Sequence, residues 1–257
     1  MKKLSSITLT LLIASSPLLN AAFREDVTLH VPSEYATIYD ALYDLDEKTI
    51  SKDVLVTIQI ADGTYNFNSP IIIEHPYSHR IQIIGNTASP SNCTLNFTGQ
   101  TNGIEINTGI KLVDGLKITG TAGFGSGIIV DRCSMANLGA NIEVQNFEDG
   151  INASNNSSIV CNGAKVRNCT RFGFYAWVGS SITAENSLAE YCEYGFMSVH
   201  GSIIEADYSS CKNNNIGYKS VHGSYIYCKH NTITGNTTDY DPLPNTNIPY
   251  YGSFIGQ

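Results

Sequence analysis

The stretch SVHGS occurs twice, at 198–202 and again at 220–224, and this interval of 22 residues belongs to a repeat that runs through most of the chain. A glycine followed by an apolar residue recurs at spacings of 24, 23, 23, 22 and 22 residues. These pairs are Gly103-Ile104, Gly127-Ile128, Gly150-Ile151, Gly173-Phe174, Gly195-Phe196 and Gly217-Tyr218. A fixed period of this length is typical of a repeat architecture, in which each repeat buries its apolar side by stacking on the next.

Within each repeat, apolar residues lie two apart and are then interrupted by glycine, asparagine and serine, which predicts short strands joined by turns. The apolar columns are Ile159, Ile182, Ile204 and Ile226, then Cys161, Ala184, Ala206 and Cys228, and then Val166, Ala189, Cys211 and Ile233. Strands that recur this often without intervening helices fit coils stacked in parallel about 4.8 Å apart. We therefore predict an all-β fold, a right-handed single-stranded parallel β-helix with 22–24 residues per coil.

The ends of the chain differ from the repeats. Ser33 precedes an apolar pattern with helical spacing, which predicts a helix at about residues 34–46 that caps the open core of the solenoid. Residues 239–257 are rich in proline and asparagine, and we expect an irregular tail there. The sequence predicts one solenoid domain over residues 23–257, which includes the capping helix and the tail.

Residues 1–22 have the layout of a secretory signal peptide, with Lys2 and Lys3 before a short apolar run and small residues at the end. The chain is therefore expected to be secreted or periplasmic and not inserted in a membrane, because no other apolar run is long enough to span one. Removing the two lysines changes the formal net charge from −8 to −10. An acidic chain lacks the basic face that nucleic-acid binding requires.

The seven cysteines fit no metal-binding spacing, and their odd number leaves at least one without a partner in the chain. Export would permit disulfides. Cys161 and Cys228 are expected three coils apart, which is too far for a bond. Cys169 and Cys192 are expected to be vertical neighbours at the limit of disulfide geometry. We predict that most of the cysteines, this pair included, are small apolar core residues.

A resemblance supports the predicted fold. The runs YATIYDALYDL and VTIQIADGTYNFNSPIIIEHPYSHRIQIIGN, followed by coils such as GFYAWVGSSITAENS, resemble the pectin-lyase-like β-helix superfamily. They are most similar to phage tail-spike and tail-fibre repeats and to related secreted bacterial proteins. The resemblance implies a right-handed β-helix that binds or cuts polysaccharide. The Asn-Thr-Asp and Gly-His-Gly motifs of polygalacturonase-like enzymes are absent, so it leaves the activity open.

The repeat assigns His200 and His222 to the same corner of successive coils. Histidine tolerates the backbone of such turns, so a structural role is the first interpretation. The two rings would lie one above the other, which keeps a small binding or metal site open as the alternative.

Three carboxylates are predicted to share one outward face. Glu205 and Asp207 are expected on one strand, and Glu185 one coil away from Asp207. Such carboxylates can act as general acid and base on a glycosidic bond, or bind Ca²⁺, the one cofactor that the sequence suggests. Tyr227 and Lys229 adjoin them and are candidates to orient a sugar. The competing interpretation is an ordinary solvated face.

An aromatic patch is predicted on the strand that follows each glycine. Tyr175 and Trp177, the only tryptophan, should point outward together beside Met197 and Val199, with Lys219 in the same column as Tyr175. Flat exposed rings suit contact with a sugar or with a second subunit of a homo-oligomer. The aromatic residues of the tail are an alternative cover for this patch.

Three functions remain open. The preferred one is a secreted protein that recognises polysaccharide through an outward face of the solenoid. The first alternative is a polysaccharide lyase or glycoside hydrolase with Glu185, Glu205 and Asp207 as catalytic residues. The second is a structural or adhesive protein without catalysis. The candidate substrate-binding residues are Tyr175, Trp177, Lys219, Tyr227, Lys229, His200 and His222.

Overall fold

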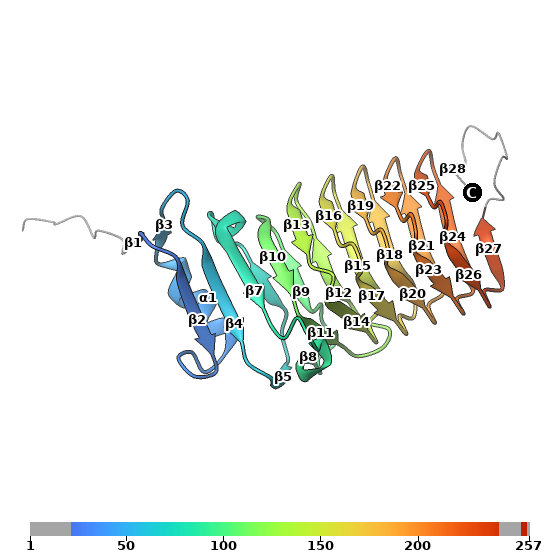
Figure 1. The fold of residues 1–257 in the computed structure, drawn as a ribbon. Helices are drawn as coiled ribbons and strands as arrows, with labels where there is room; N and C mark the ends of the chain where they lie inside the picture. The colour runs from blue at the N-terminus through green and yellow to red at the C-terminus, as the bar shows by residue number, and fades with distance from the viewer. Residues whose placement is uncertain (1–21, 242–252, 256–257) are drawn as a thin grey trace, which may run out of the picture.

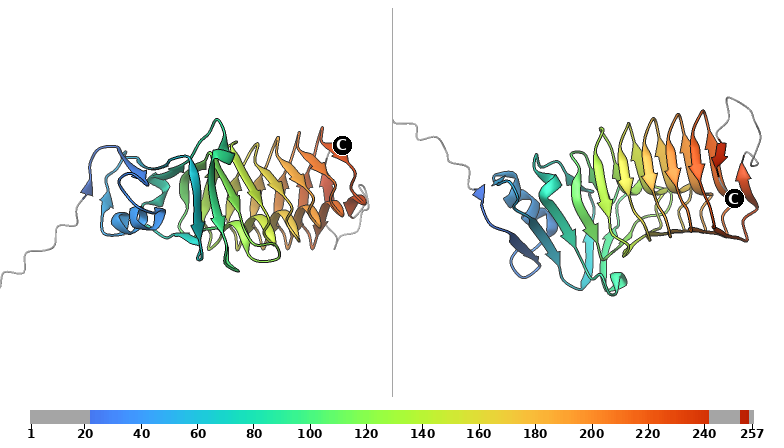
Figure 2. Two further views of the ribbon diagram at one scale, coloured as in Figure 1. Left: turned by 90° about the horizontal axis from the view of Figure 1, so that it is seen from below. Right: turned by 45° about the horizontal axis from the view of Figure 1, so that its top comes forward.

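The computed structural model describes residues 22–241 and 253–255. Over these residues the chain forms a parallel β-solenoid whose turns are stacked along one axis (Figures 1 and 2). Three parallel sheets, here called sheets I, II and III, run along its length and contain ten, eight and eight strands. The predicted all-β parallel β-helix is confirmed. No helix in the described ranges is long and apolar enough to cross a membrane.

Eight turns contribute one strand to each sheet, and sheet I has one further strand at each end. Sheet I contains β2 (Val27–Val31), β4 (Val56–Ile60), β7 (Ile81–Ile84), β10 (Ile110–Asp114), β13 (Met135–Leu138), β16 (Ser158–Val160), β19 (Ser181–Thr183), β22 (Ile203–Glu205), β25 (Tyr225–Tyr227) and β28 (Ser253–Ile255). Sheet II contains β5 (Gly63–Phe67), β8 (Cys93–Phe97), β11 (Leu116–Thr119), β14 (Ile142–Gln145), β17 (Lys165–Arg167), β20 (Leu188–Glu190), β23 (Ser210–Lys212) and β26 (Thr232–Thr234). Sheet III contains β6 (Ile71–Ile73), β9 (Ile104–Ile106), β12 (Ser126–Val130), β15 (Asp149–Ser154), β18 (Phe172–Trp177), β21 (Tyr194–Val199), β24 (Ile216–Val221) and β27 (Thr238–Asp241).

The predicted apolar columns are vertical files in the core. The isoleucine column of sheet I is paired in register from coil to coil, and its side chains are fully or almost fully buried. A file of aromatic rings fills sheet III: Phe196 stacks on Phe174 at 4.7 Å and on Tyr218 at 5.1 Å between ring centroids. Matching residues lie above one another because the coils from β13 to β27 repeat every 22 or 23 residues. The core is therefore one continuous cluster. The coils before β13 take 23–33 residues, so the predicted length of 22–24 residues per coil is too short for the N-terminal part.

Gly150 interrupts the alternation of side chains in sheet III. Asp149 pairs with Phe172 and Ile151 pairs with Phe174, so the register is the same on both sides of Gly150. A Cβ atom at Gly150 would point into the core and overlap the Val166 side chain, although the next residue, Ile151, also faces the core. This position therefore requires glycine, and the residue before it lies on the outer face.

The corners between the sheets are built from left-handed residues. His200 and His222 both have φ of 54°, in line with Val178 at 51° in the preceding coil. The predicted corner position of both histidines is therefore confirmed. Directly after this corner, buried serines form a ladder in which each backbone N–H donates to the serine Oγ of the next coil. Its bonds join Ser134 to Ser157, Ser157 to Ser180, Ser180 to Ser202 and Ser202 to Ser224, at 3.1–3.2 Å.

Replacing Ser202 by alanine is expected to lower the free energy of unfolding by about 1–3 kcal/mol. The substitution leaves the buried N–H of Ser180 without its acceptor. Denaturant unfolding followed by circular dichroism measures the change. Ser181→Ala is the control, since this half-buried serine bonds to Ser158 through its side chain only. Equal unfolding midpoints for the two variants would contradict the role of the ladder.

The capping helix α1 (Ile38–Asp46) lies at the N-terminal end of the solenoid (Figure 1). It buries Ile38, Ala41 and Leu45 against the core, as a cap requires. The predicted start at about residue 34, after Ser33, is wrong. Thr37 is the N-cap, and its side chain and that of Asp40 form a capping box that fixes the first turn. The short strands β1 (Ala22–Phe23) and β3 (Thr49–Ile50) pair beside it.

The predicted irregular tail begins too early, because residues 239–241 belong to β27, which pairs in parallel with β24. The Tyr240 ring stacks on the buried Tyr218 ring at 5.5 Å between centroids, so it continues the aromatic file of the core and does not cover the outer face. The strand β28 pairs with β25. Of the other tail residues proposed to cover the aromatic patch, Phe254 belongs to β28 and pairs with Ile226 in sheet I, whereas Tyr250 and Tyr251 lie outside what the structure describes. Most of the predicted signal peptide also lies outside the described residues.

Candidate functional site

The outer faces of the solenoid differ in chemistry. On sheet II, charges of opposite sign lie above one another in neighbouring coils: Lys165 with Glu143 and Arg167 with Glu190, each at 3.1 Å. Such pairs are typical of a solvated surface and add little stability. The outer face of sheet III instead carries aromatic and apolar side chains.

Strand β18 contributes an aromatic row, defined as Phe172, Tyr175 and Trp177, to the outer face of sheet III. The rings of Phe172 and Tyr175 stack at 4.1 Å between centroids. The Arg171 guanidinium lies 4.4 Å from the Phe172 centroid and pairs with Glu148 at 3.1 Å. Phe172 is therefore buried beneath its neighbours, while Tyr175 is half-buried and Trp177 is 36 % exposed.

Trp177 is held at the corner by the histidine pair. Its Nε1–H donates a hydrogen bond to Nδ1 of His200 at 3.1 Å, so His200 carries its proton on Nε2 in this arrangement. The rings of His200 and His222 stack at 4.5 Å with an interplanar angle of 9°. Trp177 and the histidine pair, which the sequence proposed separately, thus form one group that orients the indole.

A polar row, defined as Asp149, Asn152 and Ser154 on β15, lies beside the aromatic row. In register, Asn152 is level with Tyr175 and Ser154 with Trp177. Ser154 donates to the Asn152 side-chain oxygen at 2.8 Å, and Asn152 lies 3.4 Å from Oδ2 of Asp149. The row is a compact hydrogen-bonded group along one edge of the aromatic rings.

Asp149 is the most perturbed carboxyl group on this face. It is 8 % exposed, and burial raises its pKa to about 7 despite the opposing charge of Arg171. Its Oδ1 atom is buried and has no hydrogen-bond partner. A buried, perturbed carboxyl group beside an aromatic surface is a recognised indicator of a functional site.

Two residues of this face, Asp149 and Phe172, were not predicted from the sequence. Both precede a glycine, where strict alternation predicts an inward side chain, but the glycine and the residue after it both face the core, so the residue before them faces outward. Met197 and Val199 point outward as predicted, and they are buried because they form a small outer cluster with Phe172 against which Tyr175 and Tyr194 pack.

Lys219 lies one coil beyond Met197, in register with it. Its Nζ pairs with Asp241 at 2.7 Å and lies 5.5 Å from the Tyr194 ring. Lys219 therefore bounds the same face on the side of the C-terminal coils.

The three predicted catalytic carboxylates do not share the predicted strand, although Glu185 lies one coil from Asp207 as predicted, with the Asn186 N–H donating to the Asp207 carbonyl oxygen at 3.0 Å. Glu205 is exposed at the end of β22, but Asp207 lies in the turn that follows and accepts the Lys229 backbone N–H at 2.7 Å. The prediction that Glu205 and Asp207 share a strand is wrong, because the strands here are only three residues long. Glu185 is likewise in a turn. Tyr227 is half-buried on sheet I, level with Glu205, and Lys229 is exposed.

Candidate metal ligands were also sought throughout the described ranges. No group of three or more His, Cys, Asp or Glu side chains there is arranged to hold a metal ion. Ca²⁺ therefore stays a prediction of the sequence.

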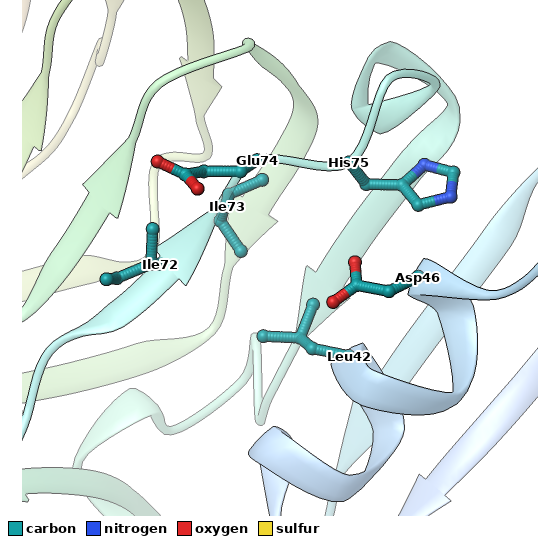
Figure 3. A pocket seen from close by; sticks show the side chains of 6 residues that line it. All are labelled: Leu42, Asp46, Ile72, Ile73, Glu74 and His75. Atoms are coloured by element: carbon teal, nitrogen blue, oxygen red, sulfur yellow. The ribbon is translucent and has the colours of Figure 1, made fainter.

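Two hollows lined by described residues lie away from these side chains. A cavity of about 180 Å³ between α1 and β6 is lined by apolar residues and by Asp46, Glu74 and His75 (Figure 3). His75 accepts the Tyr77 N–H at 3.1 Å and contacts the Lys48 carbonyl at 3.1 Å, so both ring nitrogens are used structurally. A wider groove of about 610 Å³ at the corner near Arg132 is lined by none of the predicted site residues.

A scan against known protein families and a search of curated proteins each found no match. The resemblance to pectin-lyase-like and tail-spike proteins therefore stays a prediction, and the parallel β-solenoid is what the structure establishes.

Proposed function

We propose that this protein binds polysaccharide through the outer face of sheet III, with Tyr175 and Trp177 as the contact surface. The observation that carries this proposal is the aromatic row on one strand, bordered by hydrogen-bonding groups on the next. Aromatic rings present a flat apolar surface, and Tyr and Trp keep a polar group at the edge. This combination suits a sugar, which has apolar C–H faces and a rim of hydroxyl groups.

The rigidity of the face supports the same proposal. Trp177 is fixed by its bond to His200, and the strands that carry the rings are paired on both sides. A surface that is ordered before binding loses little conformational entropy when the ligand arrives. Side chains two residues apart on a strand are about 6.5–7 Å apart, so Tyr175 and Trp177 can contact successive parts of one extended chain. The proposal includes export, which rests on the signal-like residues 1–22.

Replacing Trp177 by alanine is expected to weaken binding to the recognised polysaccharide about 30-fold or more. Loss of a central aromatic contact costs about 2 kcal/mol or more, and each 1.4 kcal/mol is a factor of ten in affinity. Because Trp177 is the only tryptophan, its fluorescence reports binding by the wild-type protein directly. Calorimetric titration then compares the variants. A panel of neutral and acidic polysaccharides, with and without Ca²⁺, identifies the ligand, and release of sugar products on it tests for catalysis.

Two controls make this experiment specific. Trp177→Phe keeps a ring and should retain part of the affinity. Tyr225→Ala removes an exposed aromatic side chain from sheet I and should leave binding unchanged. Equal binding by wild type and Trp177→Ala would refute the proposed surface. A different outcome is that the wild type binds no glycan but its molecular mass in solution rises with protein concentration, and that Trp177→Ala abolishes this rise. That outcome would assign the face to contact between two copies of the chain.

A further inference from the structure

The corner between sheets II and III contains a file of side chains that includes two cysteines. Asn214 donates its backbone N–H to Oδ1 of Asn236 at 2.9 Å, and Cys192 donates its backbone N–H to Oδ1 of Asn214 at 2.8 Å. The Cys169 backbone N–H continues the pattern by donating to the Cys192 sulfur. The two thiol groups thus occupy successive positions of an asparagine ladder, and neither sulfur is in a disulfide.

Cys169 and Cys192 are level with each other in adjacent coils. Arg167 pairs with Glu190 just before them, and Phe172 pairs with Tyr194 just after them. Each cysteine follows a left-handed residue, so the two backbones turn in the same way. Paired strands are about 4.8 Å apart, and the Cα atoms of a disulfide are usually 4.4–6.8 Å apart. The Cys169 thiol donates to the Arg167 carbonyl at 3.7 Å and the Cys192 thiol donates to the Glu190 carbonyl at 3.5 Å, so the two side chains are oriented in the same way.

We propose that Cys169 and Cys192 form an oxidisable dithiol, which a hydroperoxide converts to a disulfide between the two coils. The pair is 2 % and 5 % exposed, so a small oxidant is required. The bond would join the segments that lead directly into β18 and β21. The disulfide would therefore cross-link β18, which carries the aromatic row, to the neighbouring strand β21. This oxidation is a property separate from polysaccharide binding.

The environment assigns the two sulfurs different roles. Interaction with Cys169 lowers the pKa of the Cys192 thiol, whereas interaction with Cys192 and burial raise the pKa of Cys169. The Cys192 thiolate attacks one peroxide oxygen and the O–O bond breaks, which converts Cys192 to a sulfenic acid. The other peroxide oxygen takes a proton and leaves as water or alcohol. The Cys169 sulfur then attacks the Cys192 sulfur, loses its proton, and the sulfenic oxygen leaves as water. Two thiols are oxidised and one peroxide is reduced.

The other buried cysteines lack this arrangement. Burial raises the pKa of Cys93 to about 11 and of Cys228 to about 12, which keeps both as thiols. Cys161 and Cys228 belong to one column but are separated by three coils, about 14 Å. That distance is beyond the reach of a disulfide. Cys133 is exposed and would react with other molecules of the protein.

The test uses the full chain with Cys133→Ser, which leaves six of the seven cysteines. The reduced protein is treated with one equivalent of hydrogen peroxide, unfolded, and its thiols are counted with a chromogenic reagent. We expect the count to fall from six to four and peptide mapping to find one cross-linked peptide pair containing Cys169 and Cys192. Adding Cys192→Ser should abolish the loss, and adding Cys161→Ser should leave it unchanged. Adding Cys169→Ser should leave a sulfenic acid on Cys192 that dimedone traps.

Serine can accept the same backbone N–H bonds, so these variants are expected to keep the ladder, and circular dichroism checks their fold. Six remaining thiols, or a cross-link that persists with Cys192→Ser, would overturn the proposal. Glycan binding by the reduced protein is measured in parallel, so that failure of the dithiol and failure of the binding face are distinguishable.

Discussion

Replacing Phe196 by alanine is expected to cause the largest loss of stability of any single truncation in the aromatic file. Phe196 is fully buried and lies between the rings of Phe174 and Tyr218, at interplanar angles of 5° and 7°. Truncation of a buried phenylalanine costs about 3–5 kcal/mol, and each aromatic pair adds about 0.5–1.5 kcal/mol. The coils above and below are held at their spacing by both flanking strands, so the cavity cannot collapse. Denaturant unfolding followed by circular dichroism measures the loss.

The matched control is Phe124→Ala, which removes the same ring from a site that is 39 % exposed. We expect a change within about 0.5 kcal/mol for this variant, since surface substitutions usually have small effects. In a solenoid each coil contacts only its neighbours, so damage at Phe196 should also weaken the coils beside it. Hydrogen exchange should therefore show faster opening of β18 and β24 along with β21. An unfolding midpoint no lower than that of Phe124→Ala would contradict this account of the core.

The fold could be predicted from the sequence because stacking repeats one constraint many times. The columns of Ile204 and Val166 each needed a small or apolar residue in every coil, so each coil confirmed the pattern of the last. The capping helix was found for the same reason, since its apolar face is periodic. Its start at Thr37 was missed because the capping box depends on two side chains rather than on a period.

The site was predicted only in part, and the errors have one physical cause. At Gly150 and at the equivalent Gly173, both the glycine and the residue after it face the core, which breaks the alternation of side chains, so Asp149 and Phe172 were not expected on the outer face. The bond from Trp177 to His200 joins two residues that the sequence placed in separate groups. A regular pattern locates strands, whereas irregular positions and contacts across corners determine which side chains meet.

The stability of the protein is expected to fall as the pH rises from 5 to 8, because of Asp149. Its pKa is raised to about 7 in the folded protein from the ordinary value of 3.8. The folded state therefore binds the proton more tightly than the unfolded state. The associated stabilisation is fully present below the unfolded pKa and is lost as the pH rises through 7. A shift of about three units corresponds to about 4 kcal/mol at most.

The variant Asp149→Asn isolates this effect, because it removes the titrating group and keeps the shape. Its advantage in stability over the wild type should be small at pH 5 and largest at pH 8, where the wild type must bury a carboxylate whose Oδ1 has no partner. The control Asp131→Asn makes the same change in charge at a half-buried aspartate in the turn after β12. The Oδ1 atom of Asp131 accepts a hydrogen bond from Asn155, so this variant should show no such gain in stability at pH 8. Unfolding midpoints are compared at both pH values. An Asp149→Asn protein that loses stability between pH 5 and 8 as steeply as the wild type would show that another group is responsible.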